Sequence, residues 1–185
     1  MTPDWLTRKL NGVVVGDGVS RGIDVMAGGR LQRELKKRRP FDSLEQEAAL
    51  NITRTADRFG ICFTRLFREH GLTPSQYNVL RILRGEGKPL PILEVADRML
   101  TAVPGITGLI DRLEAMGLLA RERSTEDRRV VFVTITGSGL ELLARIDAPE
   151  AALHKRLLGH LTPNELRELT RLLEKARQSL DDCGG

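Results

Sequence analysis

Two adjacent arginines, Arg128 and Arg129, follow Asp127 in a short polar turn. A guanidinium group is permanently charged and matches phosphate oxygens, and a narrow DNA minor groove concentrates the negative potential that attracts it. A free Asp127 carboxylate would be repelled by DNA, so we expect Asp127 to hold an arginine side chain through a charge-assisted hydrogen bond. The turn therefore predicts contact with DNA, in the minor groove or at flanking phosphates.

The residues on either side of this turn have the alternation of a β-hairpin. Residues 118–123 read as a short strand, and residues 128–136 as a return strand rich in β-branched side chains. Residues 124–127 supply turn-forming side chains. The hairpin follows three short helical segments, which predicts a winged helix-turn-helix lobe over residues 72–136.

Capping residues mark the helices that must position the hairpin. Thr73 and Gln76 form a capping box at the start of one helix, which ends near Gly87. Pro91 opens the next helix. The third, predicted over residues 103–116, has an apolar stripe and would enter the DNA major groove with its N-terminal end. The residues that would then face DNA are Thr101, Ala102, Val103, Thr107 and Arg112. Arg112 has an equally weighted alternative, an ion pair with Asp111 or Asp127 inside the fold.

Helices are also predicted on both sides of the lobe. Residues 43–70 begin at the cap Ser43, and residues 138–180 contain Pro149, where we expect a kink or a brief interruption. Their leucine-rich faces exceed what one small lobe can cover, which favours a helical dimerisation domain. The fold class is therefore mainly α with a small β-hairpin wing.

Charge is distributed unevenly along the chain of 185 residues. The net charge is +4, from 29 Lys and Arg against 25 Asp and Glu, and residues 1–40 alone carry +5. The remaining residues carry −1, so global charge is not what predicts DNA binding. We interpret residues 1–40 as a flexible, basic, glycine-rich tail with a short helix before Pro40. Such a tail adds sequence-independent phosphate contacts.

The sequence contains no residue pattern typical of a catalytic site or a metal site. His70, His154 and His160 lie far apart and lack neighbouring partners, and Cys62 and Cys183 have no metal-ligand spacing. We therefore expect neither an enzyme nor a cofactor. No apolar run is long enough to span a membrane, which predicts a cytoplasmic protein without a membrane partner.

The chain resembles the MarR family of bacterial transcription regulators. The resemblance rests on residues 72–77, 110–118 and 127–136 in this order, and it extends over residues 43–180. It implies a homodimer that binds a pseudo-palindromic double-stranded operator, with Arg129 as the wing arginine. Members are most often repressors. Many carry a larger or basic residue at the position of Gly108, so base readout by this helix is expected to be sparse.

The resemblance also implies a small aromatic or phenolic effector. An effector pocket between the lobe and the dimerisation helices would draw on aromatic and polar residues of this region, namely Phe59, Phe63, Arg65, His70 and Tyr77. The alternative for the aromatic residues is packing in the core or the dimer interface. A second alternative is a redox-sensing regulator that uses Cys62, although buried free cysteines are usually inert. A third is a winged-helix module that binds protein.

Overall fold

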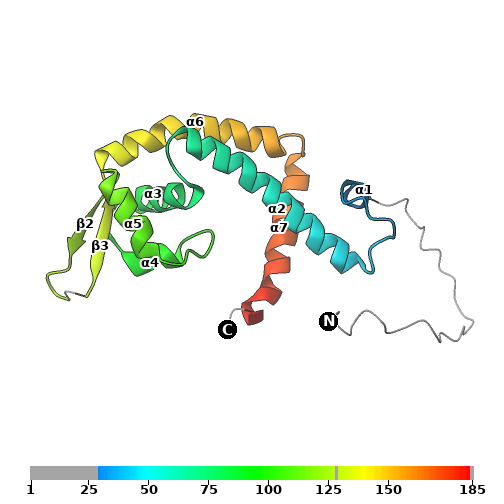
Figure 1. The fold of residues 1–185 in the computed structure, drawn as a ribbon, viewed down its shortest axis with the longest axis horizontal. Coiled ribbons are helices and arrows are strands. Elements are labelled where there is room, and N and C mark those ends of the chain that lie inside the picture. The colour runs from blue at the N-terminus through cyan, green and yellow to red at the C-terminus, as the bar shows by residue number, and fades with distance from the viewer. Residues whose placement is uncertain (1–28, 128, 184–185) are drawn as a thin grey trace, which may run out of the picture. The chain divides into compact units, whose positions relative to one another are not determined.

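The computed structural model describes residues 29–127 and 129–183, which are mainly α-helical (Figure 1). The chain divides into two compact units, Met1–Asn51 and Ile52–Gly185. The helices are α1 (Arg30–Glu34), α2 (Leu44–Glu69), α3 (Pro74–Glu86), α4 (Ile92–Asp97), α5 (Ile106–Ala115), α6 (Gly137–Leu158) and α7 (Pro163–Arg177). The strands are β1 (Leu90–Pro91), β2 (Leu119–Arg123) and β3 (Val131–Ile135), and a 3-10 helix covers Gln178–Cys183.

The first unit holds α1 and the first turns of α2. The Ser43 hydroxyl accepts a hydrogen bond from the backbone N–H of Gln46 at 3.1 Å, which confirms the predicted helix cap. The Gln46 side chain in turn accepts from the backbone N–H of Asp42 at 2.9 Å. The helix α1 is the short helix expected before Pro40. The rest of the predicted tail, residues 1–28, lies outside the described residues.

The second unit contains one aliphatic core that joins α3, α5, the small sheet and α6. Its fully buried side chains include Leu80, Leu83, Leu90, Ile110, Leu113, Leu119, Leu143 and Ile146. Because close-packed interiors relax only partly around a lost methyl group, truncating one of these leucines to alanine costs roughly 2–5 kcal/mol. This core holds the helix-turn-helix and the sheet as one body.

The sheet has three antiparallel strands in the order β1-β3-β2. The predicted hairpin of β2 and β3 is confirmed, with Arg121 opposite Val133. The strand β1 is an addition that the sequence pattern did not predict, and it pairs Leu90 with Val133 and Pro91 with Phe132. Two residues are too few for a readable alternation. Pro91 lacks an N–H donor and fits here because β1 is an edge strand.

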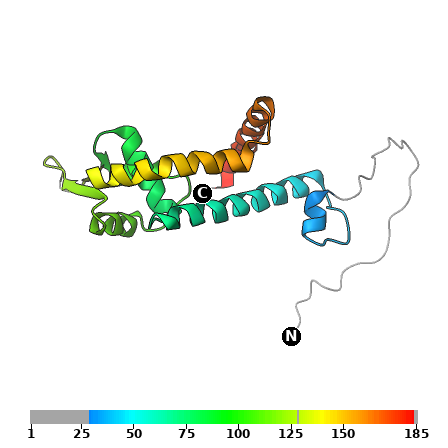
Figure 2. The same ribbon diagram turned by 90° about the horizontal axis from the view of Figure 1, so that it is seen from above.

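The helix α6 connects the sheet to the second half of α2. Thr136 caps it: its hydroxyl accepts from the backbone N–H of Gly139 at 3.2 Å and donates to the carbonyl of Gly117 at 2.7 Å. Pro149 lies inside α6 without ending it, so the interruption allowed by the sequence does not occur. Figure 2 shows α6 alongside the second half of α2.

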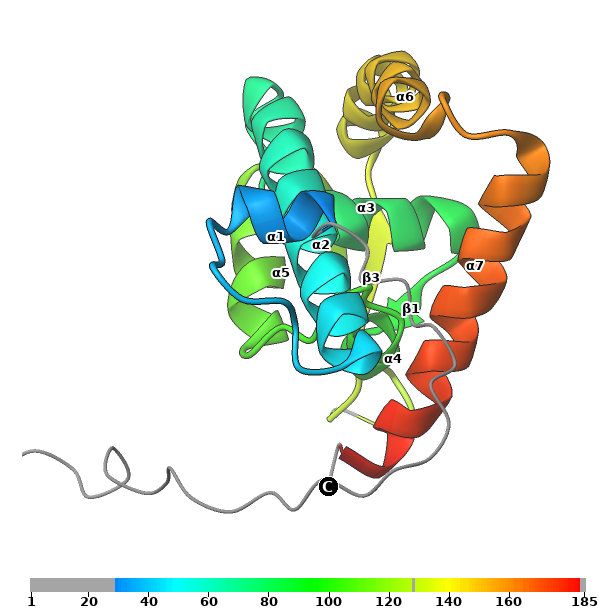
Figure 3. The same cartoon turned by 90° about the vertical axis from the view of Figure 1, so that its right-hand side faces the viewer.

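The helix α7 begins at a capping box formed by Thr162 and Glu165. It has no buried residue, and its apolar side chains include Leu169 and Leu172, which are 37% and 48% exposed. In Figure 3 it runs away from the end of α6 as a separate rod. Among the described residues no helix is long and apolar enough to cross a membrane.

Candidate nucleic-acid interface

The helix α5 and the turn before it hold the residues predicted to read DNA. The helix begins at Ile106 rather than near Val103, because Gly105 adopts a left-handed φ of +75° immediately before it. Thr101, Ala102 and Thr107 are exposed. Val103 is half-buried and packs against the core. The turn therefore presents Thr101 and Ala102 to solvent and is anchored by Val103, while Thr107 is presented by the first turn of α5.

A buried amide on α3 fixes this turn. The side-chain carbonyl of Asn78, a residue that is only 7% exposed, accepts a hydrogen bond from the backbone N–H of Leu100 at 2.8 Å. Leu100 itself is 85% exposed and lies next to Thr101. Neither residue was predicted from the sequence. A polar residue within the apolar run from Tyr77 to Leu80 was the available signal, since buried amides nearly always have a hydrogen-bond partner.

A salt-bridge cluster joins α5 to the wing. Arg121 on β2 pairs with Asp111, and its Nε lies 3.1 Å from the Glu114 carboxylate. Asp111 is thus engaged by Arg121 and not by Arg112, which was one of the expected alternatives. In the part of the chain that the structure describes, exposed Arg112 has no ion pair. Its guanidinium is the cation that α5 itself offers to a ligand.

The wing tip is a hydrogen-bonded turn. The Ser124 hydroxyl accepts from the backbone N–H groups of Glu126 and Asp127, each at 3.2 Å. The Asp127 carboxylate accepts from the backbone N–H of Arg129 at 2.9 Å. Among the described residues, the Asp127 carboxylate is therefore bonded to the main chain of Arg129, and the expected bond to an arginine side chain stays a prediction. Arg129 is exposed, and Arg128 lies outside the described residues.

A second ionic cluster joins α3 to α4 behind this surface. Arg98 donates to Glu86 at 2.6 Å and also pairs with Glu94. Hydrogen bonds from Arg98 and Lys88 hold the pKa of Glu86 below its ordinary value. Because these groups are on the surface, the pairs contribute little stability individually.

Aromatic side chains link α2, α3 and α6. The rings of Phe67 and Tyr77 stack with centroids 4.1 Å apart, and Phe63 stacks on Phe67 at 5.9 Å and meets His154 at 5.2 Å. The Tyr77 hydroxyl donates to the Glu150 carboxylate at 2.5 Å. Burial and this hydrogen bond raise the pKa of Tyr77 well above its ordinary value. Two of the residues considered for an effector pocket, Phe63 and Tyr77, are thus used in packing.

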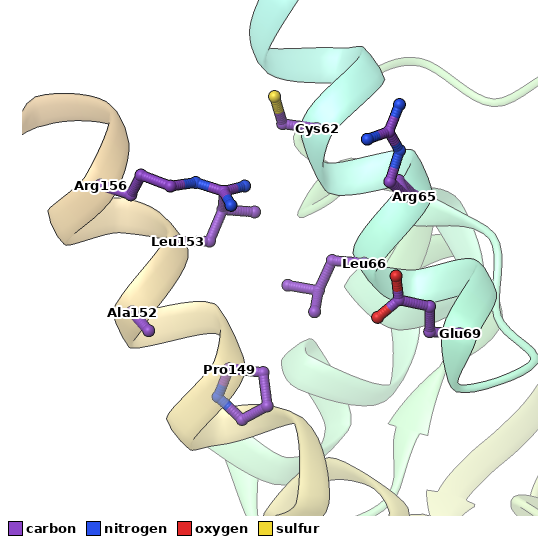
Figure 4. A pocket seen from close by; sticks show the side chains of 8 residues that line it. All are labelled: Cys62, Arg65, Leu66, Glu69, Pro149, Ala152, Leu153 and Arg156. Carbon is purple, nitrogen blue, oxygen red and sulfur yellow. The ribbon is translucent and has the colours of Figure 1, made fainter.

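A pocket of about 290 Å³ lies between the second half of α2 and α6. Its lining residues are Cys62, Arg65, Leu66, Glu69, Pro149, Ala152, Leu153 and Arg156. In Figure 4 Leu66 and Leu153 project into the gap from opposite helices, and Arg156 extends from α6 toward α2. In the described part of the chain, neither Arg65 nor Arg156 has a hydrogen bond or an ion pair. The pocket lining therefore combines apolar side chains with two available guanidinium groups and the carboxylate of Glu69.

The five residues predicted for an effector pocket do not gather at this site. Arg65 lines the pocket, whereas Phe59, Phe63, His70 and Tyr77 are not among the lining residues. The sequence missed Arg156, because only the fold brings α6 beside α2. Cys62 is a half-buried free thiol at the pocket wall. Among the described residues no cluster of His, Cys, Asp and Glu could hold a metal ion.

Comparisons with known proteins agree with this geometry. Residues 72–131 match the family model described as "MarR family". The HTH-type transcriptional regulator YkoM of Bacillus subtilis, described as uncharacterized, is 32% identical over 74% of this chain and 90% of its own. The crystal structure of a MarR transcription factor from Planctomyces limnophilus is 46% identical, with a TM-score of 0.58 over 72% of this chain and 98% of that one.

A third similarity concerns ligand response. The structure of BpsR from Bordetella bronchiseptica, described with a mechanism for regulation of its DNA binding by 6-hydroxynicotinic acid, is 28% identical. Its TM-score is 0.63, over 70% of this chain and 98% of that one. The helix-turn-helix, the sheet and these similarities lead to one conclusion. The chain belongs to the MarR family of winged helix-turn-helix transcriptional regulators.

Proposed function

We propose that this regulator acts as a homodimeric, sequence-specific repressor whose binding to a pseudo-palindromic operator is modulated by a small organic anion. The observation that carries the DNA-binding part is the shared surface of α5 and the wing. Arg121 ties the two elements together, and Arg112 and Arg129 remain exposed on them. Arginines on a rigid frame suit phosphate and minor-groove contacts, with few direct base contacts from α5.

Dimerisation is inferred from apolar surface on the helices outside the lobe. Ile61 on α2 is 52% exposed, and α7 exposes Leu172 and has no buried residue. Helices of this kind bury their apolar faces against a second copy in the MarR family. A two-fold dimer would then place two α5 helices on half-sites about one turn of DNA apart.

The pocket between α2 and α6 is the proposed effector site. Its two arginines favour a carboxylate or phenolate, and Leu66 and Leu153 favour an aromatic ring. Support for this ligand class comes from BpsR, whose DNA binding is regulated by the aromatic acid 6-hydroxynicotinic acid. The pocket lies between the helix that continues from the wing and a helix with exposed apolar residues. A ligand there can bias the spacing of the two lobes.

The test is a gel shift with duplexes from the DNA upstream of the protein's own gene, run with and without 4-hydroxybenzoate. We expect salt-sensitive binding that persists in the presence of excess unrelated competitor duplex. This binding should weaken as the aromatic acid is added. Arg156→Gln should bind the operator normally but respond less to the acid. A chain that binds no upstream fragment is instead a winged-helix module for protein partners.

Cys62 supports one alternative for the signal, because the thiol lies in the wall of the same pocket. Peroxide treatment separates the two. The pocket would be assigned to redox sensing if peroxide releases the wild-type protein from DNA, Cys62→Ser abolishes that release, and aromatic acids have no effect. Cytoplasmic location belongs to the same proposal, since the operator is found there.

A further inference from the structure

The turn between α1 and α2, within the first unit, is closed by hydrogen bonds. Lys36 takes a left-handed φ of 51°, and the chain folds back so that the backbone N–H of Lys37 donates to the carbonyl of Gln32 at 3.0 Å. The Gln32 side chain donates to the Lys37 carbonyl at 3.2 Å. We call residues 36–39, Lys-Lys-Arg-Arg, the basic turn.

Lys37 holds the far side of this turn. Its Nζ donates to the carbonyl of Pro40 at 2.7 Å and lies 5.4 Å from the centroid of the Phe41 ring. A lysine that bonds a carbonyl and lies over a ring is committed to local structure. The two residues that follow, Arg38 and Arg39, are both exposed.

The acidic residues around the basic turn are engaged elsewhere. Glu34 accepts from Arg30 at 2.7 Å, and the Asp42 carboxylate accepts from the Gln46 side chain at 3.3 Å. Hydrogen bonds at the start of α2, from its own backbone and from Ser43, hold the pKa of Glu45 below its ordinary value. In the described part of the chain, neither Arg38 nor Arg39 has a hydrogen bond or an ion pair. Two adjacent guanidinium groups are therefore available to a partner.

The chemistry of that partner follows from charge. Residues 1–40 carry a net +5, whereas the rest of the chain carries −1. Guanidinium groups bind phosphate through paired, charge-assisted hydrogen bonds, and a DNA duplex is the phosphate-rich partner of a MarR regulator.

We propose that the basic turn binds DNA phosphates outside the bases read by α5 and the wing, through Arg38 and Arg39. This inference rests on the proposed DNA-binding function. The contact adds affinity for any sequence and carries no sequence preference of its own. It therefore makes operator binding steeper in its dependence on salt.

The experiment compares the full chain with Arg38→Gln/Arg39→Gln. Fluorescence anisotropy is measured on the operator and on an unrelated duplex across a range of salt concentrations. Two arginines in each of two protomers allow four phosphate contacts, so the slope of log K against log salt should fall in magnitude by up to about 3.6. Affinity should fall by the same factor for both duplexes, and their ratio should stay within about twofold.

Two control variants isolate the contact. Arg167→Gln/Lys175→Gln removes the same charge from the exposed side of α7 and should leave the slope unchanged. Arg38→Lys/Arg39→Lys keeps the charge and should retain most of the slope. Both Arg38 and Arg39 are exposed, so circular dichroism should show an unchanged melting temperature in all variants.

Three results would overturn the inference. One is a wild-type slope in Arg38→Gln/Arg39→Gln, and another is an equal loss of slope in the α7 control. The third is a loss of affinity confined to the operator. In each of these the wild-type protein still prefers its operator, so the proposed function survives. A wild-type protein that fails to bind any duplex removes the proposed function and this inference together.

Discussion

Arg129 lies at the tip of the wing with its backbone held and its side chain exposed. The N–H of Arg129 donates to Asp127, whose own N–H donates to Ser124, so both of these backbone groups have hydrogen-bond partners within the wing. Arg129 can therefore contribute to affinity without contributing to the stability of the fold.

We predict that Arg129→Ala weakens operator binding by roughly 1–3 kcal/mol, because one minor-groove or phosphate contact is lost in each protomer. Anisotropy titration measures the affinity, and sedimentation should report an unchanged oligomer. Arg177→Ala, a truncation on α7, is the matched control and should bind as wild type. Wild-type affinity in Arg129→Ala would show that the wing tip does not touch DNA.

Tyr77 permits a separate test, because it is the only tyrosine in the chain. Its pKa is raised by burial and by the hydrogen bond to Glu150. The folded chain therefore keeps the proton to higher pH than the unfolded chain, in which tyrosine titrates near pH 10. The stabilisation is complete below about pH 10 and is lost as the pH rises above that value toward the raised pKa.

We expect absorbance near 295 nm to show less tyrosinate in native protein at pH 11 than in urea-unfolded protein at the same pH. The melting temperature should fall more steeply between pH 9 and 11 in wild type than in Tyr77→Phe. At neutral pH, Tyr77→Phe should cost roughly 1.5–3 kcal/mol, the range for a hydrogen bond to a charged group. Identical tyrosinate curves for native and unfolded protein would contradict the buried contact.

Two glycines at equivalent places in two helices differ in their surroundings. Gly108 and Gly139 are each the third residue of their helix, α5 and α6. A Cβ on Gly108 would meet nothing within 4 Å, whereas a Cβ on Gly139 would overlap the Leu118 carbonyl and lie 2.7 Å from the Ile135 side chain. The absence of a side chain at Gly139 is what lets α6 begin against the sheet.

Gly139→Ala should therefore destabilise the fold by roughly 1–3 kcal/mol through overpacking. Gly108→Ala should leave stability unchanged or raise it by up to about 1 kcal/mol, because alanine favours helix more than glycine does. Urea midpoints measure both. If the two variants shift the midpoint equally, the close approach of α6 to Leu118 is wrong.

The sequence predicted the elements that have strong local signals. Capping at Ser43 and Thr73, and the β-branched residues of β3, are local signals and came out as expected. The strand β1, which it missed, has two residues and forms because it pairs with β3, far along the chain. The helix α5 was predicted, but its start was placed too early because the left-handed conformation of Gly105 was not anticipated.

The candidate site divides in the same way. Arg112 and Arg129 were proposed from residue type and spacing, and their contact with DNA stays a prediction. Asn78 bonds a residue 22 positions away, and Arg121 bonds one 10 positions away. Arg156 lines a pocket with residues of α2, which is far from α6 in the sequence. No local pattern shows these three roles. Tyr77, considered for the effector pocket, packs against Phe67 instead because α3 crosses the end of α2.

At the scale of the whole molecule, apolar helix faces predict association. We expect Leu172→Glu to shift the protein from dimer to monomer in sedimentation velocity, because it places a carboxylate among exposed leucines of α7. Arg171→Glu adds a carboxylate to the opposite side of the same helix and should remain dimeric. A Leu172→Glu protein with the sedimentation of wild type would exclude α7 from the interface.

Two copies of this fold are proposed to bind one operator through α5 and the wing. A hydroxyl-radical footprint on the DNA upstream of the protein's own gene tests this binding mode. We expect two protected patches related by a two-fold axis, with centres about 10 base pairs or a multiple apart. The protection should weaken as salt rises. A single asymmetric patch, or no protection at low salt, would contradict it.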